Sequence, residues 1–290
     1  MGKSSGKTKG ASGQIYSRGN TAVRWILSIF LICYTAITFF VFCVTIMNSF
    51  KAQSDLSTSI FGWPKQFTLS NYVMVIQKNG FFQSFANSLI VTAGGTTLCI
   101  FLAALTAYGI SRYEFRGKGF LTAYFLIGMM VPIQVAILPL FLMLSKVHLI
   151  NSRIGLALVY GAGISFPMYV FSKFFRTIPK ALEESAKLDG ASDFRIFWSI
   201  MLPICKPVIL TMCLITSIGF WNDFYVPMVL LSRKAKQTLM LSIYQYISQF
   251  VRKMNIAFAA VVLTLIPIIM IYCVFNKQMV EGITGGSVKG

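Results

Sequence analysis

The sequence predicts an all-α membrane protein with six transmembrane helices. Its 290 residues are 56% hydrophobic and 12% charged, with a mean hydropathy of +0.71, which is too apolar for a soluble domain of this length. A transmembrane helix needs about 20 largely apolar residues, and six runs meet this requirement. These runs do not alternate apolar and polar residues as the strands of a membrane barrel do, so helices are expected. The six runs are residues 25–48, 85–110, 120–145, 154–172, 206–231 and 257–276.

The formal charge of +18 is distributed in a way that predicts the orientation of these helices. With the N-terminus in the cytoplasm, the inner connecting segments hold 16 Lys and Arg residues and the outer ones hold 10. Because cytoplasmic loops are enriched in Lys and Arg, both termini are expected inside the cell. Nucleic acid is not an expected partner, since the basic residues lie between apolar spans and form no continuous stripe.

The chain divides into a basic tail over residues 1–24, a six-helix domain over residues 25–280 and a short tail over residues 281–290. The first tail is rich in Gly, Ser and Lys and has no acid, which predicts a flexible segment close to anionic lipid heads. Its G-K-S-S-G-K-T sequence resembles a phosphate-binding loop but lacks one residue between the glycines, and no strand precedes it. Nucleotide binding is therefore not expected there.

The second and third spans carry signals for close packing and for kinks. Small residues recur every four positions in the second span, at Gly95, Cys99, Ala103 and Ala107. Another helix can pack closely on such a stripe. In the third span, Pro132 and Pro139 are expected to kink the helix, with the amide of Gln134 between them. A kinked helix with a buried amide suits either a pore lining or ordinary helix packing.

An amide and an acid interrupt the fifth span. Asn222 and Asp223 lie between the aromatic residues Trp221 and Tyr225. Acids within a membrane are costly and usually face a cavity or a partner. Two hypotheses follow. Either these four residues, together with Gln134, line the path of a polar substrate, or Asp223 pairs within the bundle and only holds helices together.

The remaining reactive residues predict neither catalysis nor metal binding. The six cysteines lie in or beside apolar spans without C-x-x-C spacing, so neither disulfides nor a metal site are expected. His148 is the only histidine, and one histidine makes neither a metal site nor a catalytic triad. The chain also has no nucleophile beside a base and no acid pair in a pocket, so it is not expected to be an enzyme.

The segment between the fourth and fifth spans, residues 177–207, holds four of the eight acids. Pro179 can open a helix, because the first helical residue needs no partner for its N–H. Glu183 and Glu184 would then face the positive end of the helix dipole. Gly190 is expected to close this helix in the left-handed conformation.

A second helix is expected directly after this glycine. Ser192 or Asp193 can cap its start, and Pro203 would stop it. Its apolar stripe consists of Phe194, Phe197, Trp198 and Met201. This periodicity makes the helix amphipathic. The segment therefore predicts a helix, a sharp glycine turn and another helix on the cytoplasmic side.

This helix-turn-helix segment resembles the EAA loop of binding-protein-dependent ABC importer permeases. The family pattern begins with E-A-A, continues to a glycine and ends with I-x-L-P. The matching residues are Glu184, Ser185, Ala186, Gly190, Ile200, Leu202 and Pro203, with Glu183, Asp189 and Ala191 also in agreement. Ser185 replaces the first alanine of the pattern, which exchanges one small residue for another. The runs at 107–118, 132–140, 221–224 and 282–290 are similar to the carbohydrate (MalG-like) branch of the family.

The resemblance implies a type I ABC importer in a bacterial cell membrane. Its partners would be a second permease forming a heterodimer, two cytoplasmic ATPase subunits, an external solute-binding protein, a sugar and the membrane lipid. ATP and Mg²⁺ would bind to the ATPase, and this chain would hold no cofactor. The matching residues of the loop, Glu183 among them, would couple the permease to the ATPase.

Two alternatives remain open at the level of the sequence. A permease of the same family could carry another solute, such as a glycerol-phosphate compound. An ion-coupled transporter working alone would use Asp223 as its ion-binding residue.

Overall fold

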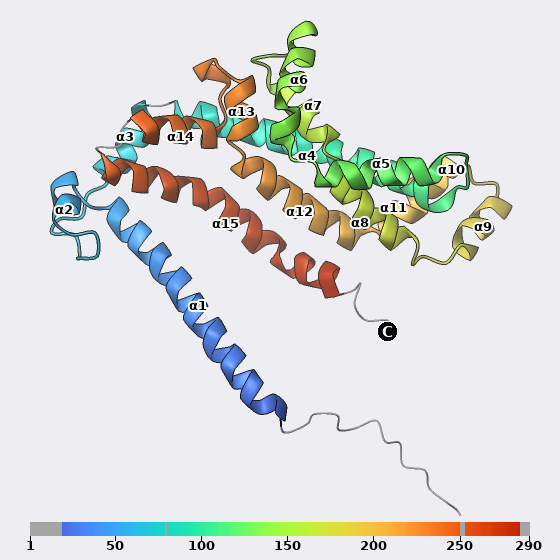
Figure 1. Ribbon diagram of the computed structural model, residues 1–290, viewed down its shortest axis with the longest axis horizontal. Helices are drawn as coiled ribbons and strands as arrows, with labels where there is room; N and C mark the ends of the chain where they lie inside the picture. Colours follow the sequence, from blue (N-terminus) through green and yellow to red (C-terminus); the bar gives the residue numbers. More distant parts are fainter. Residues whose placement is uncertain (1–18, 79, 250–252, 285–290) are drawn as a thin grey trace, which may run out of the picture.

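The computed structural model describes residues 19–78, 80–249 and 253–284, and the regular elements in these ranges are helices (Figure 1). The first eight are α1 (Gly19–Ser49), α2 (Gln53–Thr58), α3 (Ser70–Lys78), α4 (Phe81–Arg112), α5 (Lys118–Met130), α6 (Ile133–Lys146), α7 (Arg153–Ala162) and α8 (Ser165–Phe175). They are followed by α9 (Ala181–Leu188), α10 (Asp193–Ile196), the π-helical turn η1 (Phe197–Met201), α11 (Leu202–Ile204), α12 (Lys206–Asn222), α13 (Tyr225–Leu230), the 3₁₀ turn η2 (Lys234–Lys236), α14 (Leu239–Gln249) and α15 (Met254–Thr284). The all-α prediction is confirmed for the described part of the chain.

Helical structure covers the six predicted apolar runs, but several of them are bent or broken. Within the described residues, α1 from Val23 onward and the whole of α4 are long and apolar enough to cross a membrane as single helices. The pairs α5/α6 and α7/α8 bend by 104° and 43°, and the chain bends by 77° where α11 meets α12. The run of α15 from Met254 to Met270 is a shorter apolar helix.

The sharpest of these bends has a local cause. Pro132 is the N-cap of α6, and the preceding Val131 is extended, with φ −82° and ψ 119°. A residue before proline is driven out of the helical region by the proline ring, so α5 ends there. The predicted kink at Pro132 is confirmed and is larger than a simple kink, whereas Pro139 lies inside an uninterrupted α6.

α4 lies at the centre of the bundle, where it contacts α7, α8 and α12. Its small residues make this possible. Cys99, Ala103 and Ala107 have no exposed surface, and a Cβ atom added to Gly95 would lie 2.8 Å from Cβ of Tyr160. The predicted stripe of small residues is therefore confirmed as a site of close helix packing.

The elements outside the central helices gather at opposite ends of α4 (Figure 1). α9 and α10 lie at one end, and α2, α3 and α14 lie at the other. α1 lies to one side and contacts α15. An 18-residue apolar window of α1 contains no buried residue, so most of this helix is open to lipid or to another protein, whereas Asn48 and Ser49 at its end are buried.

Candidate functional site

The first candidate site is the segment that contains α9 and α10, because its local geometry follows the predicted helix, turn and helix. α9 ends with Gly190 at φ +77°, in the left-handed region. The Gly190 N–H donates to the Lys187 carbonyl at 3.0 Å, and the Ala191 N–H donates to the Ala186 carbonyl at 2.9 Å. These two bonds form a Schellman motif, in which the last carbonyls of a helix are satisfied by residues beyond its end. The predicted glycine turn is confirmed.

The second helix begins as predicted but packs differently. Ser192 Oγ accepts a hydrogen bond from the Arg195 N–H at 3.4 Å, which confirms the serine cap. Phe194 and Trp198 stack on each other yet remain exposed by 66% and 54%. The core contains Phe197 and Met201 of the predicted stripe, together with Ile196.

The stripe predicted for this helix is therefore confirmed at Phe197 and Met201 and wrong at Phe194 and Trp198, because the buried face is the one centred on Phe197. The stop predicted at Pro203 lies one residue before the observed end of the helix. The helix continues to Ile204 and then bends into α12. The π-helical turn before Pro203 changes the hydrogen-bond pattern, so its missing N–H is accommodated.

A nearly buried ion pair joins α9 to the end of α4. Arg112 Nε lies 2.6 Å from Glu183 Oε1, and the two side chains are only 4% and 12% exposed. Tyr108 donates its hydroxyl hydrogen to Glu183 Oε2 at 3.2 Å, and Arg112 Nη2 donates to the Ile178 carbonyl at 2.9 Å. Sequence reasoning grouped Glu183 with Glu184, whereas the structure directs Glu183 inward and leaves Glu184 exposed.

A charged depression of about 140 Å³ opens beside this pair. Its lining residues are Arg112, Lys180, Glu183, Glu184 and Lys187. Lys187 Nζ also reaches Asp193 Oδ1 at 2.9 Å. This hydrogen bond raises the pKa of Lys187 and lowers the pKa of Asp193. The other residues of the predicted loop set lie around it: Ser185, Asp189, Gly190 and Pro203 are exposed, and Ala186, Ala191 and Leu202 are half-buried.

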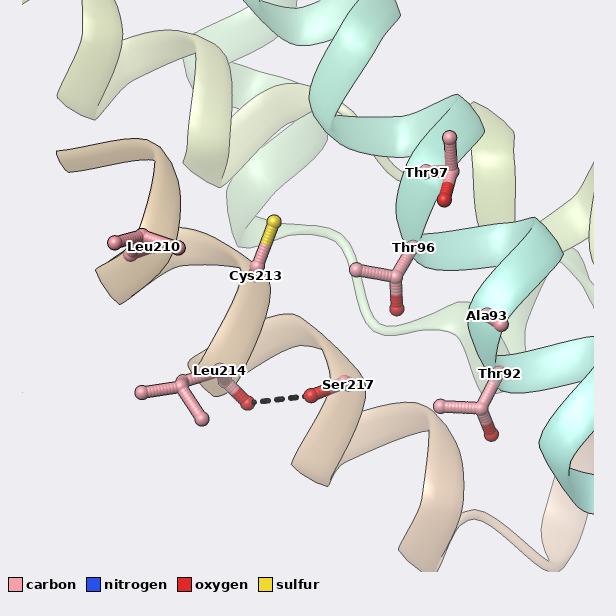
Figure 2. Close-up of a pocket in the computed structure, with 8 residues that line it drawn as sticks. All are labelled: Thr92, Ala93, Thr96, Thr97, Leu210, Cys213, Leu214 and Ser217. Carbon is pink, nitrogen blue, oxygen red and sulfur yellow. Dashed lines mark hydrogen bonds between the residues drawn. The ribbon is translucent and has the colours of Figure 1, made fainter. Parts of the chain in front are cut away.

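A second candidate site is a pocket of about 320 Å³ between α4 and α12, which sequence reasoning missed (Figure 2). Its lining residues are Thr92, Ala93, Thr96, Thr97, Leu210, Cys213, Leu214 and Ser217. Ser217 donates to the Leu214 carbonyl at 3.1 Å, whereas Thr96 Oγ1 is buried without a hydrogen-bond partner. The threonine spacing along the second span was the available signal. The pocket combines hydroxyl groups with methyl groups, which allows hydrogen bonding and apolar contact but no acid-base chemistry.

Among the residues predicted for the substrate path, Asp223 is held by hydrogen bonds within the chain. Asp223 Oδ2 accepts from the Tyr160 hydroxyl at 2.8 Å, and Oδ1 accepts from the backbone N–H groups of Tyr225 and Val226 at 2.9 and 3.3 Å. Asp223 therefore caps α13 and ties it to α7, as the bundle-pairing hypothesis expects. Tyr160 is held in place by Phe220, whose ring stacks on it at 4.3 Å.

The other residues predicted for a substrate path differ in their access. Asn222 and Gln134 are exposed, and Tyr225 is half-buried. Trp221 is only 2% exposed, because it packs between helices with its ring edge-on to Phe85. Its side chain therefore contributes to packing and does not face a path in this conformation. Among the described residues, no group of His, Cys, Asp and Glu is placed to hold a metal ion.

Comparison with known families decides what kind of protein carries these features. Residues 95–284 match the family described as the binding-protein-dependent transport system inner membrane component. The chain belongs to this family. The matched range includes α9, α10, α12 and most of the α4–α12 pocket. Members of this family are permease subunits of ABC transporters and not enzymes, so this chain is a membrane transport component.

Relatives cover nearly the whole chain. The diacetylchitobiose uptake system permease protein NgcG of Streptomyces coelicolor is 32% identical over 262 residues, which are 89% of this chain and 87% of the relative. The arabinooligosaccharides transport system permease protein AraQ of Bacillus subtilis is 32% identical over 276 residues, which are 92% of this chain and 96% of the relative. A chain of a bacterial ABC transporter involved in the import of the acidic polysaccharide alginate shares the fold, with a TM-score of 0.78 and 23% identity over 91% of this chain and 99% of that one.

Proposed function

We propose that this chain is a transmembrane permease subunit of an ATP-driven importer for an oligosaccharide that an external binding protein delivers. The observation that carries this proposal is the likeness to NgcG and AraQ over nearly the full length of each chain. Both names specify the uptake or transport of short sugar chains. The exposed α9, with its glycine turn, supports a role in which a partner protein docks at that end of the bundle.

Six membrane crossings account for the helices and for the charge distribution. α1, α4, α12 and α15 each provide one crossing, and the bent pairs α5/α6 and α7/α8 provide the other two. This order places α9 and α10 in the cytoplasm together with both termini, and α2, α3 and α14 outside. The excess of Lys and Arg in the inner segments, 16 against 10, favours this orientation.

The cytoplasmic ATPase binds α9 and the charged depression beside it. Glu184, Ser185 and Asp189 present exposed side chains there, and the Gly190 turn fixes the angle between α9 and α10. Ala186, Ala191 and Leu202 are half-buried and pack against the core cluster, and Pro203 is exposed. ATP and Mg²⁺ bind to the ATPase subunits, as the family resemblance implies, since the glycine-rich sequence near the start of this chain lacks one residue of the phosphate-binding pattern. Two ATPase subunits and a second permease complete the transporter, and α1 packs against that permease or against lipid.

The sugar path runs along the face of α12. Asn222 and Gln134 are exposed amides that can hydrogen-bond to sugar hydroxyl groups, and the α4–α12 pocket adds threonine hydroxyls in an apolar setting. Asp223 and Tyr225 shape the path at the break between α12 and α13. Trp221 supports Asn222 from the core.

Co-purification with the ATPase tests the docking part of this proposal. Glu184→Lys reverses an exposed charge on α9, and Gly190→Pro removes the left-handed turn. Both variants are expected to insert into the membrane and to lose the ATPase. If both retain the ATPase and transport normally, α9 is not the docking site.

Uptake assays test the substrate. Cells that carry the transporter are offered radiolabelled diacetylchitobiose, arabinotriose, an alginate trisaccharide and glycerol 3-phosphate. Uptake of at least one saccharide that depends on the ATPase is expected. Uptake of glycerol 3-phosphate alone would assign a different solute, and uptake that survives deletion of the ATPase would indicate an ion-coupled transporter.

A further inference from the structure

The pair formed by Arg112 and Glu183 occupies a position that the docking role of α9 does not explain. Residues that only bind an external partner need to be exposed, but these two side chains are almost fully buried. Their polar contacts are with residues of this chain: the ion pair itself, the hydroxyl of Tyr108 and the carbonyl of Ile178. The pair therefore connects α9 to α4.

Two routes lead from α9 to the α4–α12 pocket. The first is the chain itself, which runs from α9 through α10, η1 and α11 into α12. The second is the Arg112–Glu183 pair, which reaches the end of α4. α4 is an unbroken helix of 32 residues that carries Thr92 and Thr96 in its middle. Because α12 and α4 are the two walls of the pocket (Figure 2), each route ends on one wall.

We infer that Arg112 and Glu183 are positioning residues that make α4 follow the displacement of α9, so that both walls of the α4–α12 pocket respond to the ATPase. This inference rests on the proposed function, since the ATPase supplies the displacement. A buried ion pair suits the task. Separating the two charges leaves each one in a poorly solvated position, so the pair stays closed when α9 moves.

Two other ion pairs at the same end of the bundle lack this property. Glu114 and Lys118 are four residues apart on one segment, and the Glu114 side chain is 87% exposed. Lys187 and Asp193 are each about half exposed. Exposed ion pairs contribute little to stability. Neither of these two pairs connects another helix to α4.

Hydrogen exchange measured by mass spectrometry on the co-purified transporter, with and without a non-hydrolysable ATP analogue, tests the inference. In the wild type, peptides from α9 and from residues 92–112 of α4 are both expected to change their exchange when the nucleotide binds. The test variant is Arg112→Gln, which keeps a long polar side chain but removes the charge and so breaks the ion pair with Glu183. The α9 peptides should still respond, and the α4 response should fall at least about fivefold, as expected for the loss of a typical coupling free energy.

Two further variants complete the experiment. The double variant Arg112→Glu with Glu183→Arg restores an ion pair of opposite polarity and should recover most of the α4 response. Glu114→Gln breaks the exposed pair and should behave as the wild type. An α4 response in Arg112→Gln equal to that of the wild type would overturn the inference. Equal losses in α9 and α4 would do the same, because they would show a purely structural role.

Failure of the proposed function gives a different result. In that case the wild-type chain would not co-purify with an ATPase, which is visible before any variant is made. A transporter that assembles but whose α4 ignores Arg112 would refute only the inference.

Discussion

The two ends of α4 are held by different chemistry. At the end near α9, the side chains of Arg112 and Glu183 attract each other as opposite charges. At the other end, Asn87 Nδ2 donates to the carbonyls of Ala235 and Gln237 at 3.0 and 2.9 Å. Ser88 Oγ accepts from the Leu239 N–H at 2.8 Å. Asn87 and Ser88 thus bind the backbone of the segment before α14 at one end of α4, whereas the ion pair of Arg112 and Glu183 joins α9 at the other end. Figure 1 shows α14 and α9 at these opposite ends.

This difference agrees with the inference that the end near α9 is the one that moves. A hydrogen bond to a backbone carbonyl weakens steeply once the distance exceeds about 3.5 Å, so Asn87 fixes the segment before α14 in one place. Coulomb attraction falls only with the inverse of distance, so two long charged side chains remain attracted through a small shift. Under the inference above, the end near α9 moves while the ion pair keeps α4 attached and the hydrogen bond from Arg112 to the Ile178 carbonyl adjusts. The opposite end serves as the fixed end.

The fixed end extends beyond α4. Asn71 Nδ2 donates to the carbonyls of Ser49 and Lys51 at 2.8 and 2.9 Å, and Asn255 donates to Asn71 Oδ1 at 2.7 Å. These amides join the end of α1 to α3 and α15. Lys51 is the exception in this neutral network, because it is 1% exposed, and burial lowers its pKa. Its Nζ is satisfied by two carbonyls, those of residues 59 and 60.

The largest effect is expected from removing one charge of the buried pair. Glu183→Ala leaves the Arg112 charge buried with only the Ile178 carbonyl, so the free energy of unfolding should fall by about 3–5 kcal/mol. Thermal unfolding of the purified transporter in detergent measures this loss. Glu114→Ala is the matched control, and because its pair with Lys118 is exposed, its loss of stability should be far smaller. Equal losses in the two variants would remove the contrast between buried and exposed charges.

A smaller loss is expected at the fixed end. Asn87→Ala removes two donated hydrogen bonds and the one that Asn87 Oδ1 accepts from Arg153. Unsatisfied buried groups cost about 1–3 kcal/mol each, and water can replace part of this, so a total loss of about 2–3 kcal/mol is expected. The same unfolding assay applies, with the exposed Gln83→Ala on the same helix as the control. If Asn87→Ala did not change the free energy of unfolding, the hydrogen bonds of Asn87 would not be what fixes this end.

The glycine turn should contribute less again. Gly190→Ala places a side chain at φ +77°, although nothing lies within 4 Å of the added Cβ. The cost is therefore backbone strain alone, about 1–2 kcal/mol. Gly119→Ala on α5 also meets nothing within 4 Å and has no positive φ, so it should be neutral or stabilising. A similar loss in both variants would show that the left-handed conformation is not what the turn requires.

The smallest effect concerns pH at the exposed pair of Lys187 and Asp193. The folded pKa of Asp193 lies below its ordinary value of 3.8, chiefly because of the hydrogen bond from Lys187. Stability from this pair is therefore present above pH 3.8 and is lost as the pH falls through the folded pKa. Asp193→Asn should be slightly less stable than the wild type at neutral pH, with the difference vanishing on acidification. A difference that grows in acid would reverse the assigned sign.

Local sequence determined much of the fold of this protein. The left-handed Gly190, the Ser192 cap, the break at Pro132 and the smooth stripe of α4 each depend on residues a few positions apart. Such features could be predicted because backbone sterics and helical periodicity act over one or two turns. The family resemblance rested on the same kind of local pattern, since the loop residues from Glu184 to Pro203 are close together in the chain.

Only the tertiary structure determined which side chains of these local elements contact one another. Glu183 pairs with Arg112, and Asp223 accepts a hydrogen bond from Tyr160. Each of these contacts joins residues that lie far apart in the sequence. Helical periodicity identified an apolar face after Gly190 but not the rotation that exposed Trp198 and buried Phe197. Such choices depend on which surfaces meet when the helices pack, because burial and ion pairing are properties of two contacting faces and not of one segment.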